Sequence, residues 1–318
     1  MLRIVIGLCT LGLLAEGSAF AQEDFVGVRA LGMGEAMRAS ATGAEAALLN
    51  PAAMSLVKQY VIEAQYGLRV EDLGHHTSVA IVDSITTRVG ASLYYNFAYS
   101  SPKFGFVWPG GFVKDGAATR IVHVAGLALS VPIGEKVILG ATTKYVYSTF
   151  TAPLPMGSMP TAVSFGGVNG VTWDASMLLR LGKFNLTTIG YNLWDHGSRE
   201  TPLGLGMAVA VIPVPELTLN FDSVVNFTGY QSLRYDKDNN PVYDTRITAR
   251  IGAGLEYTIK QKVPIRLGYT YDSGRPASFV SVGLGYVSNL FGIDVGYRSQ
   301  VQGGRENFIM TGLRIFVP

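Results

Sequence analysis

The sequence has 318 residues and a single cysteine, Cys9. That cysteine lies in the first 21 residues, which have the layout of a secretory signal peptide: Arg3, then an apolar run, then an A-x-A cleavage site at Ala19-Phe20-Ala21. We therefore expect residues 1–21 to be removed and the mature chain to begin near Gln22. A mature chain without a thiol has no disulfide, no thiolate metal ligand and no cysteine nucleophile.

Charged residues are scarce as well. They make up 15% of the chain, well below the roughly 25% typical of soluble domains. The net charge is only +2, so no basic excess is available to neutralise phosphates, and nucleic acid is excluded as a partner.

Long apolar runs are missing too. After residue 22 no run of about 18 apolar residues occurs, so the sequence offers no transmembrane helix. An exported, apolar chain that lacks spanning helices indicates a closed β-barrel, because barrels are the other fold that satisfies every backbone hydrogen bond in lipid. The 38 Gly, 16 Tyr and 15 Phe suit such a lipid-facing sheet.

From about residue 58 the chain consists of short segments in which apolar and polar residues alternate. The clearest is TRITARIGAGLEYTI at 245–259, where one parity is apolar throughout and the other carries Arg246, Arg250 and Glu256. A period of two indicates a strand with one apolar and one polar face. The segments are 58–70, 74–84, 88–99, 119–132, 136–148, 170–181, 184–195, 202–213, 216–227, 244–259, 263–272, 278–288, 290–299 and 305–317.

The connections between these segments alternate in length. The short ones are PIGE, LGKF, PVPE, KQKV and SNL, and the longer ones are 100–118, 149–169, 196–201, 228–243 and 300–304. Bacterial outer-membrane barrels have short periplasmic turns, longer external loops and an even number of strands. We therefore predict an all-β fold over residues 58–318: one transmembrane antiparallel β-barrel of about fourteen strands, in the outer membrane of a Gram-negative bacterium, with both termini periplasmic. Because three segments alternate poorly, twelve strands is the alternative.

Residues 22–57 have a different composition. They are rich in Ala, Glu, Met and Leu, so short helices are expected. The helical pattern should stop by Asn50, because the residue before Pro51 is pushed out of the helical region. Side chains alone would not fill the interior of a barrel of about fourteen strands, so we predict that this segment folds into the lumen as a plug. Asn50 and Pro51 then form either the hinge of the plug or a plain helix stop.

The same segment carries a family resemblance. Arg29-Ala30-Leu31-Gly32-Met33-Gly34-Glu35-Ala36 is followed by an Ala-rich stretch and then by Asn50-Pro51-Ala52-Ala53-Met54. In these motifs and in its strand count the chain resembles the FadL/PorV superfamily of outer-membrane proteins. The resemblance to FadL implies capture of hydrophobic molecules in an external apolar groove and their passage into the lumen as the plug moves. The resemblance to PorV implies the alternative, a barrel that is the partner or shuttle of a secretion or surface-attachment machine.

Two neighbouring external loops are unusually apolar. One contains FGFVWPGGFV at 104–113, and the other, 149–169, has no charged residue. Exposed apolar clusters of this size mark interaction sites, so we predict that these loops capture hydrophobic ligands. The alternatives are that they pack on each other as a lid or dock a partner protein. The predicted binding residues are Phe104, Phe106, Trp108, Phe112, Met156, Met159 and Phe165.

Charged residues of the lumen-facing parity recur on the last five segments. We expect them to form a solvated ladder of ion pairs inside the barrel, and a carboxylate-binding role for some of the arginines is the alternative. These residues are Arg246, Arg250, Glu256, Arg266, Asp272, Asp294, Arg298 and Arg314.

No constellation for catalysis or metal binding is visible. His75 and His76 sit in a predicted external loop, His123 and His196 are isolated, and further ligands at a suitable spacing are missing. We therefore predict no enzyme, no metal and no cofactor. The predicted function is passive transport of hydrophobic small molecules, fatty-acid-like or aromatic, across the outer membrane. The predicted partners are outer-membrane lipid, the hydrophobic ligand and, in the alternative role, another envelope protein.

Overall fold

The structure is a computed structural model that describes residues 25–107, 113–156, 159–229, 231–235 and 241–318. The predicted signal peptide and two of the predicted binding residues, Trp108 and Phe112, lie outside the described residues.

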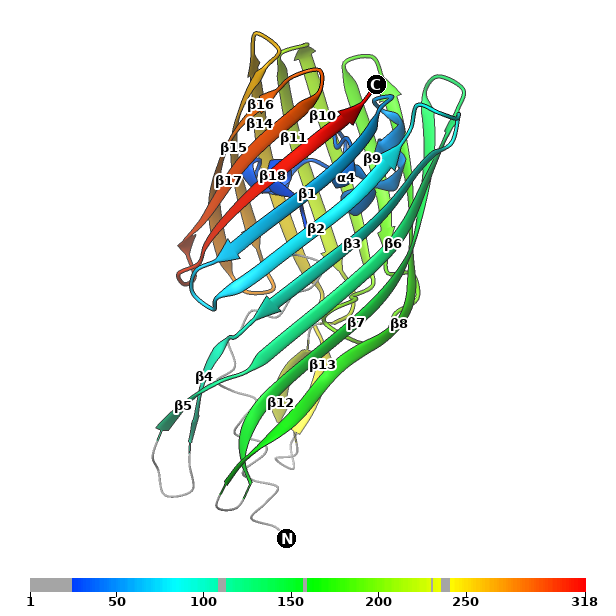
Figure 1. Cartoon of the computed structure of the whole chain (residues 1–318). Helices are drawn as coiled ribbons and strands as arrows, with labels where there is room; N and C mark the ends of the chain where they lie inside the picture. The colour runs from blue at the N-terminus through cyan, green and yellow to red at the C-terminus, as the bar shows by residue number, and fades with distance from the viewer. Residues whose placement is uncertain (1–24, 108–112, 157–158, 230, 236–240) are drawn as a thin grey trace.

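Fourteen antiparallel strands close into one barrel (Figure 1), in the order β1-β18-β17-β16-β15-β14-β11-β10-β9-β8-β7-β6-β3-β2. The first strand closes the barrel by pairing with the last, with Tyr60 opposite Val317 and Arg69 opposite Phe308. The barrel strands are β1 (Tyr60–Arg69), β2 (Gly74–Asp83), β3 (Gly90–Ser100), β6 (Thr119–Ile133), β7 (Val137–Met156), β8 (Met159–Leu181), β9 (Phe184–Tyr191), β10 (Gly204–Val214), β11 (Leu217–Asn226), β14 (Thr248–Ile259), β15 (Val263–Asp272), β16 (Ala277–Val287), β17 (Phe291–Gln302) and β18 (Asn307–Val317).

The two faces of the wall have opposite polarity. On β14, Ile251 is 54% exposed on the outside, whereas its neighbour Arg250 is 7% exposed inside. Apolar side chains thus cover the outside of the barrel and polar ones line the inside, which is the arrangement of a barrel built for lipid. The predicted all-β fold with fourteen barrel strands is confirmed.

The two ends of the barrel differ. At the turn end, where the C-terminus lies, the strands are joined by short connections, such as 182–183 between β8 and β9. At the opposite end, called here the hairpin end, two small hairpins lie beyond the wall: β4 (Lys103–Val107) with β5 (Val113–Ala117), and β12 (Gln231–Tyr235) with β13 (Pro241–Thr245).

The prediction of a loop at 149–169 is wrong. Strands β7 and β8 continue through it as a hairpin that projects past the barrel, with Pro155 paired to Pro160 and Met156 to Met159. The paired prolines are unusual for strands, because proline cannot donate a hydrogen bond within a sheet. Both strands of a free two-stranded hairpin are edge strands, however, and edge strands accommodate proline.

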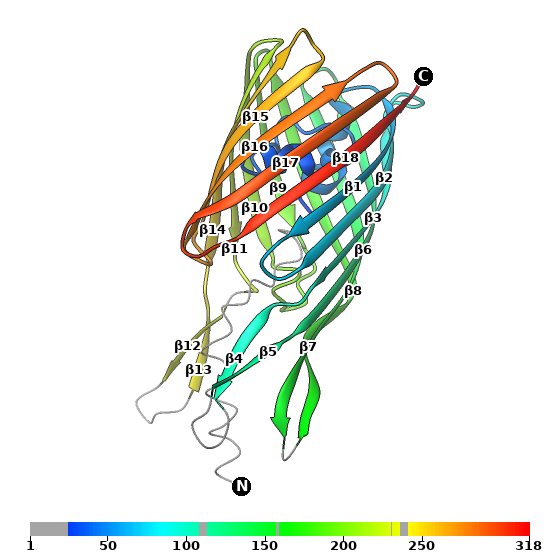
Figure 2. The same cartoon turned by 60° about the vertical axis from the view of Figure 1, so that its left-hand side comes forward.

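The N-terminal segment, residues 25–57, lies inside the barrel (Figure 2). It contains α3 (Val28–Gly32), α4 (Ala44–Leu49) and the 3₁₀ helix η2 (Pro51–Ser55). Helix α4 ends at Asn50, which adopts an extended conformation before Pro51, as predicted, and the Asn50 side chain accepts a hydrogen bond from Ala52 N at 3.2 Å. In the described part of the chain, no helix combines the length and the apolar character needed to cross a membrane.

Glycines on the inner wall let this segment approach the strands closely. A Cβ atom at Gly140 of β7 would lie 2.1 Å from Ala52 N, and one at Gly254 of β14 would lie 2.3 Å from Met33 O. Such distances are far below van der Waals contact, so only glycine allows backbone to lie against backbone here. The wall glycines in close contact with the segment are Gly140, Gly252, Gly254, Gly268, Gly283, Gly296 and Gly312.

Candidate functional site

The contact between the N-terminal segment and the wall contains a closed ring of ion pairs. Glu35 of the segment contacts both Arg250 of β14, at 2.7 Å, and Arg298 of β17. Three wall or loop residues complete the ring, so that three carboxylates alternate with three guanidinium groups. The members in order are Glu35, Arg298, Glu306, Arg275, Asp272 and Arg250.

Glu306 lies in the connection between β17 and β18. Burial acts to raise the pKa of the Glu306 carboxyl. The guanidinium groups of Arg298 and Arg275 outweigh this effect and hold that pKa well below its usual range. The ring therefore keeps Glu306 charged at neutral pH, and its ion pairs fix Glu35 at the wall.

A second cluster surrounds Arg29 and α4. The Arg29 guanidinium lies 2.8 Å from the Glu45 carboxylate, and the backbone N–H of Arg29 donates to the same carboxylate at 2.7 Å. Burial, together with the nearby Glu63 carboxylate, raises the pKa of Glu45 to about 7 against the opposing effect of Arg29. This ion pair therefore ties α3 to α4 within the segment, and the pKa of its acid lies near neutral pH.

Asp222 of β11 holds the middle of the segment. Its carboxylate accepts hydrogen bonds from the backbone N–H of Met37, at 3.0 Å, and of Arg38, at 2.9 Å, and also pairs with the Arg38 side chain. Asn50 is fixed nearby, because its amide donates to Arg38 O at 2.8 Å and to Thr187 Oγ1 at 3.0 Å.

Most of the other wall charges predicted to face the lumen are also buried beside an opposite charge, not solvated as expected, although Glu256 is partly exposed. Arg266 contacts Glu256 at 2.5 Å and Asp294 at 2.7 Å, and Arg314 contacts Asp294 at 2.7 Å. Arg246 differs, since it is exposed at the hairpin end and donates to Ser273 O at 3.0 Å.

The connection from β9 to β10, residues 192–203, is anchored to the inner wall at the hairpin end through the buried Asn192 and Glu200. Arg120 of β6 holds it through two parallel hydrogen bonds to Glu200, of 2.8 and 2.9 Å, and both side chains are buried. Lys144 of β7 donates to Asn192 at 2.9 Å. Between this connection and the N-terminal segment lies a cavity of about 40 Å³, lined by residues that include Phe25, Leu48, Tyr94, Val124 and Val146.

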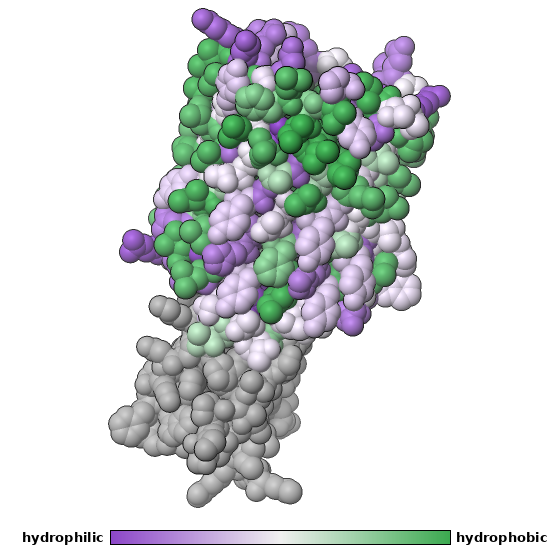
Figure 3. Space-filling view, viewed as in Figure 1, coloured by the Kyte–Doolittle hydropathy of each residue, from purple (hydrophilic) through white to green (hydrophobic). Residues whose placement is uncertain are grey.

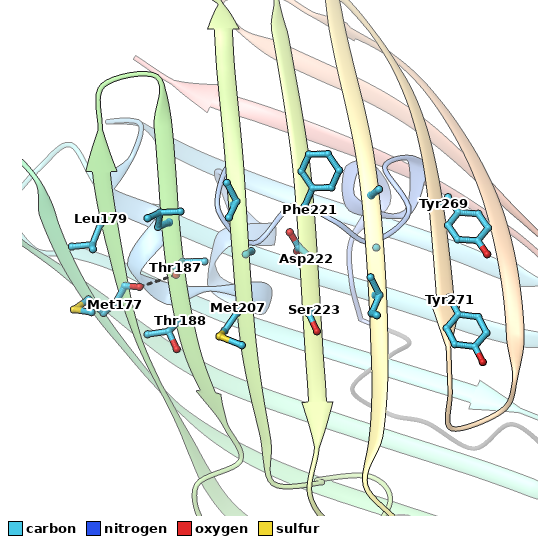
Figure 4. Close-up of a pocket in the computed structure, with 16 residues that line it drawn as sticks. Met177, Leu179, Thr187, Thr188, Met207, Phe221, Asp222, Ser223, Tyr269 and Tyr271 are labelled. Atoms are coloured by element: carbon cyan, nitrogen blue, oxygen red, sulfur yellow. Dashed lines mark hydrogen bonds between the residues drawn. The ribbon is translucent and has the colours of Figure 1, made fainter.

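A broad hollow lies on the outer wall. It is a groove of about 660 Å³ that crosses β8 to β15 (Figure 4), and its lining is almost entirely apolar. One row of paired residues explains its shape, because small side chains stand between bulky ones. That row is Met177, Thr188, Met207, Ser223, Ile251 and Tyr271. The groove therefore faces lipid rather than the lumen.

The predicted binding residues of the external loops lie on the projecting hairpins. Phe104 and Phe106 are on β4, Met156 and Met159 are at the tip of the β7–β8 hairpin, and Phe165 is on β8. Strand β5 contacts β7, so the two hairpins lie side by side at the same end of the barrel (Figure 1).

The residues that sequence reasoning missed are those that hold the segment and the connection 192–203, above all Glu35, Glu45, Asp222, Arg120 and Glu200. Glu35 stands inside the motif quoted above, and Arg120 and Asp222 have the lumen-facing parity of their strands, which is the signal that pointed to the other wall charges. Within the described residues, no three metal-binding side chains gather into a possible metal site.

The fold is shared with solved outer-membrane channels. The chain is similar to the Ralstonia pickettii toluene transporter TbuX, with a TM-score of 0.71, 12% identity, and coverage of 92% of this chain and 98% of TbuX. The fold is that of the FadL-type barrels. A Pseudomonas aeruginosa FadL homologue gives a TM-score of 0.67, 12% identity, and coverage of 91% and 98%. The Pseudomonas putida toluene transporter TodX gives a TM-score of 0.69 and 13% identity, with coverage of 91% of this chain and 96% of TodX.

At sequence identities this low, the structural similarity establishes the FadL-type fold and no more. No family model matches the sequence, and no curated protein matches it. The resemblance predicted from the glycine and Asn-Pro-Ala motifs is confirmed at the level of the fold.

Proposed function

We propose that this protein is an outer-membrane channel through which hydrophobic small molecules, fatty-acid-like or aromatic, pass without an energy source. The observation that carries the proposal is the fold shared along nearly the whole chain with proteins described as toluene transporters and a monoaromatic hydrocarbon channel. The apolar outer wall and polar inner wall support it, because they suit a barrel in lipid.

In the proposed orientation the hairpin end faces outward and the turn end faces the periplasm. The long β7–β8 hairpin and the two small sheets at one end, against short turns at the other, support this assignment. Both termini are then periplasmic.

Capture is proposed to occur on the two neighbouring hairpins β4–β5 and β7–β8. Their backbones lie side by side and carry Phe104, Phe106, Met156, Met159 and Phe165 at this end. Trp108 and Phe112, which lie outside the described residues, belong to the same proposed capture set. Methionine and aromatic side chains adapt to apolar ligands of varied shape.

Passage is proposed to require movement of the N-terminal segment, which acts as a plug. The segment is held to the wall by a few ion pairs and hydrogen bonds, among them the buried pairs of Glu35 with Arg250 and Arg298. Movement about Asn50 and Pro51 would leave η2 in place against β6 and β7.

The test measures a hydrophobic fluorescent probe that the intact outer membrane excludes. Gram-negative cells producing the protein should take up the probe faster than cells without it. Phe106→Ala with Trp108→Ala should abolish the gain, whereas the matched control Phe184→Ala with Phe291→Ala, at the turn end, should keep it. No gain with the unmodified protein overturns the channel, and a gain that survives Phe106→Ala with Trp108→Ala overturns capture on the hairpins. Co-purification of another envelope protein, without any gain in uptake, would favour the PorV-like role.

A further inference from the structure

Two of the four histidines lie on the outer wall, where each is bonded to a tyrosine of a neighbouring strand. His75 of β2 and Tyr66 of β1 approach to 2.7 Å between Nδ1 and the hydroxyl oxygen, and His123 of β6 and Tyr95 of β3 approach to 2.6 Å. The loop position predicted for His75 and His76 is wrong, because both lie within β2. The outward parity of His75 and His123 places them on the lipid side.

Aromatic rings surround both imidazoles. Ring centroids of Tyr66 and Tyr99 lie 6.1 and 6.3 Å from that of His75. Those of Tyr95, Phe97 and Tyr147 lie 6.1, 5.1 and 5.9 Å from that of His123. The two groups form one aromatic patch across β1, β2, β3, β6 and β7.

The patch belongs to a belt near the hairpin end of the wall. Farther round the barrel, the hydroxyl of Tyr145 donates to Asn169 at 2.8 Å and that of Tyr297 donates to Asn307 at 2.6 Å. Figure 3 shows apolar side chains gathered over the upper half of the barrel and paler, ring-bearing side chains below them. Tyrosine belts of this kind mark the boundary between hydrocarbon and head groups.

We propose that His75 and His123 bind the phosphate head groups of the lipid leaflet around the hairpin end. An imidazolium that donates from Nδ1 to the tyrosine oxygen keeps a second N–H and a positive charge for an anion. The belt lies at the boundary between hydrocarbon and head groups. The anion available at this depth is therefore the phosphate of the lipid head groups.

No neighbouring acidic side chain described below is paired with His75 or His123, so both imidazoles can contact lipid. The residues paired with His123 across the sheet are Phe97 and Tyr147, and those paired with His75 are Leu68 and Tyr99. The acids of the adjacent connection are bound elsewhere: Glu71 accepts from Asn307, and Asp72 pairs with Arg69 at 2.5 Å.

The test uses native mass spectrometry of the mature protein in mixed micelles doped with phosphatidylglycerol or with uncharged diacylglycerol. At pH 6 we expect about fivefold more phosphatidylglycerol than diacylglycerol to be retained, since two exposed ion pairs each contribute a factor of about two to three. His75→Gln with His123→Gln should remove the difference. The control is His196→Gln, because the His196 ring already contacts Val171 O at 3.0 Å.

Two results would overturn the proposal: equal retention of both lipids by the unmodified protein at pH 6, or an undiminished preference for phosphatidylglycerol in the double variant. A third experiment adds inorganic phosphate as a competitor. If millimolar phosphate displaced the lipid, the site would bind anions without specificity for lipid, and this result would also overturn the proposal. The inference rests on the barrel lying in an outer membrane as proposed above. Lipid retention and probe uptake are independent measurements, so failure of one is distinguishable from failure of the other.

Discussion

Gly34 of the N-terminal segment lies directly against Gly268 of β15. A Cβ atom at position 268 would stand 1.9 Å from Gly34 N, and the hydroxyl of the neighbouring Thr270 donates to Gly34 O at 2.6 Å. The segment and the wall therefore meet backbone to backbone, and no side-chain rotation can relieve a methyl group added between them.

Gly268→Ala should displace the N-terminal segment while leaving the barrel closed, because the methyl group would overlap the backbone of Met33 and Gly34. We expect a larger ion conductance in planar bilayers than the unmodified protein shows. Gly190→Ala is the matched control: its Cβ would meet the flexible Leu193 side chain first, at 2.9 Å. Equal conductance of the two variants would contradict the close contact.

Glu35→Gln should loosen the segment by breaking the ion-pair ring, since two buried guanidinium groups lose a carboxylate partner. Removing one partner of a buried ion pair costs about 3–5 kcal/mol. Hydrogen exchange of residues 28–37 should accelerate accordingly. Glu135→Gln, in an exposed turn, should leave the exchange unchanged, and protection that survives Glu35→Gln would show that the ring does not hold the segment.

The docking of α4 should weaken as the pH rises from about 4.5 to about 7. Burial raises the pKa of Glu45 to about 7 from its ordinary 4.5, so the docked state binds more protons than the released state between these values, and its stability falls with rising pH. Hydrogen exchange of residues 44–49, corrected for its intrinsic pH dependence, should report this fall. In Glu45→Gln the slope should vanish, and a slope that persisted would place the titrating group elsewhere.

Arg120 and Glu200 should be energetically coupled, because they form a buried pair with two parallel hydrogen bonds. Glu200→Gln and Arg120→Met should each lower the denaturant midpoint of the barrel in micelles. The double variant should lose less than the sum, by a coupling energy of about 0.5–3 kcal/mol. Strict additivity would mean that the connection 192–203 is held by other contacts.

Several features could be read from the sequence. Alternation along segments such as 245–259 predicted the strands, because a two-residue period places one set of side chains in lipid and the other in the lumen. The helix stop at Asn50 followed from Pro51. The continuation of β7 and β8 through 149–169 did not follow, since proline suggests a loop unless the strand is known to be an edge. Capture by the hairpins and the hinge at Asn50 remain predictions.

The sequence by itself determined that the chain forms a closed barrel with an apolar outside, because alternation and the absence of spanning helices are local properties of the chain. Only the tertiary structure decided which charges meet. Glu35 is 215 residues from Arg250 and 263 residues from Arg298, and no local pattern encodes the distance between them. The physical reason is that strand register and close glycine contacts, set by closure of the whole barrel, bring these groups within hydrogen-bonding range.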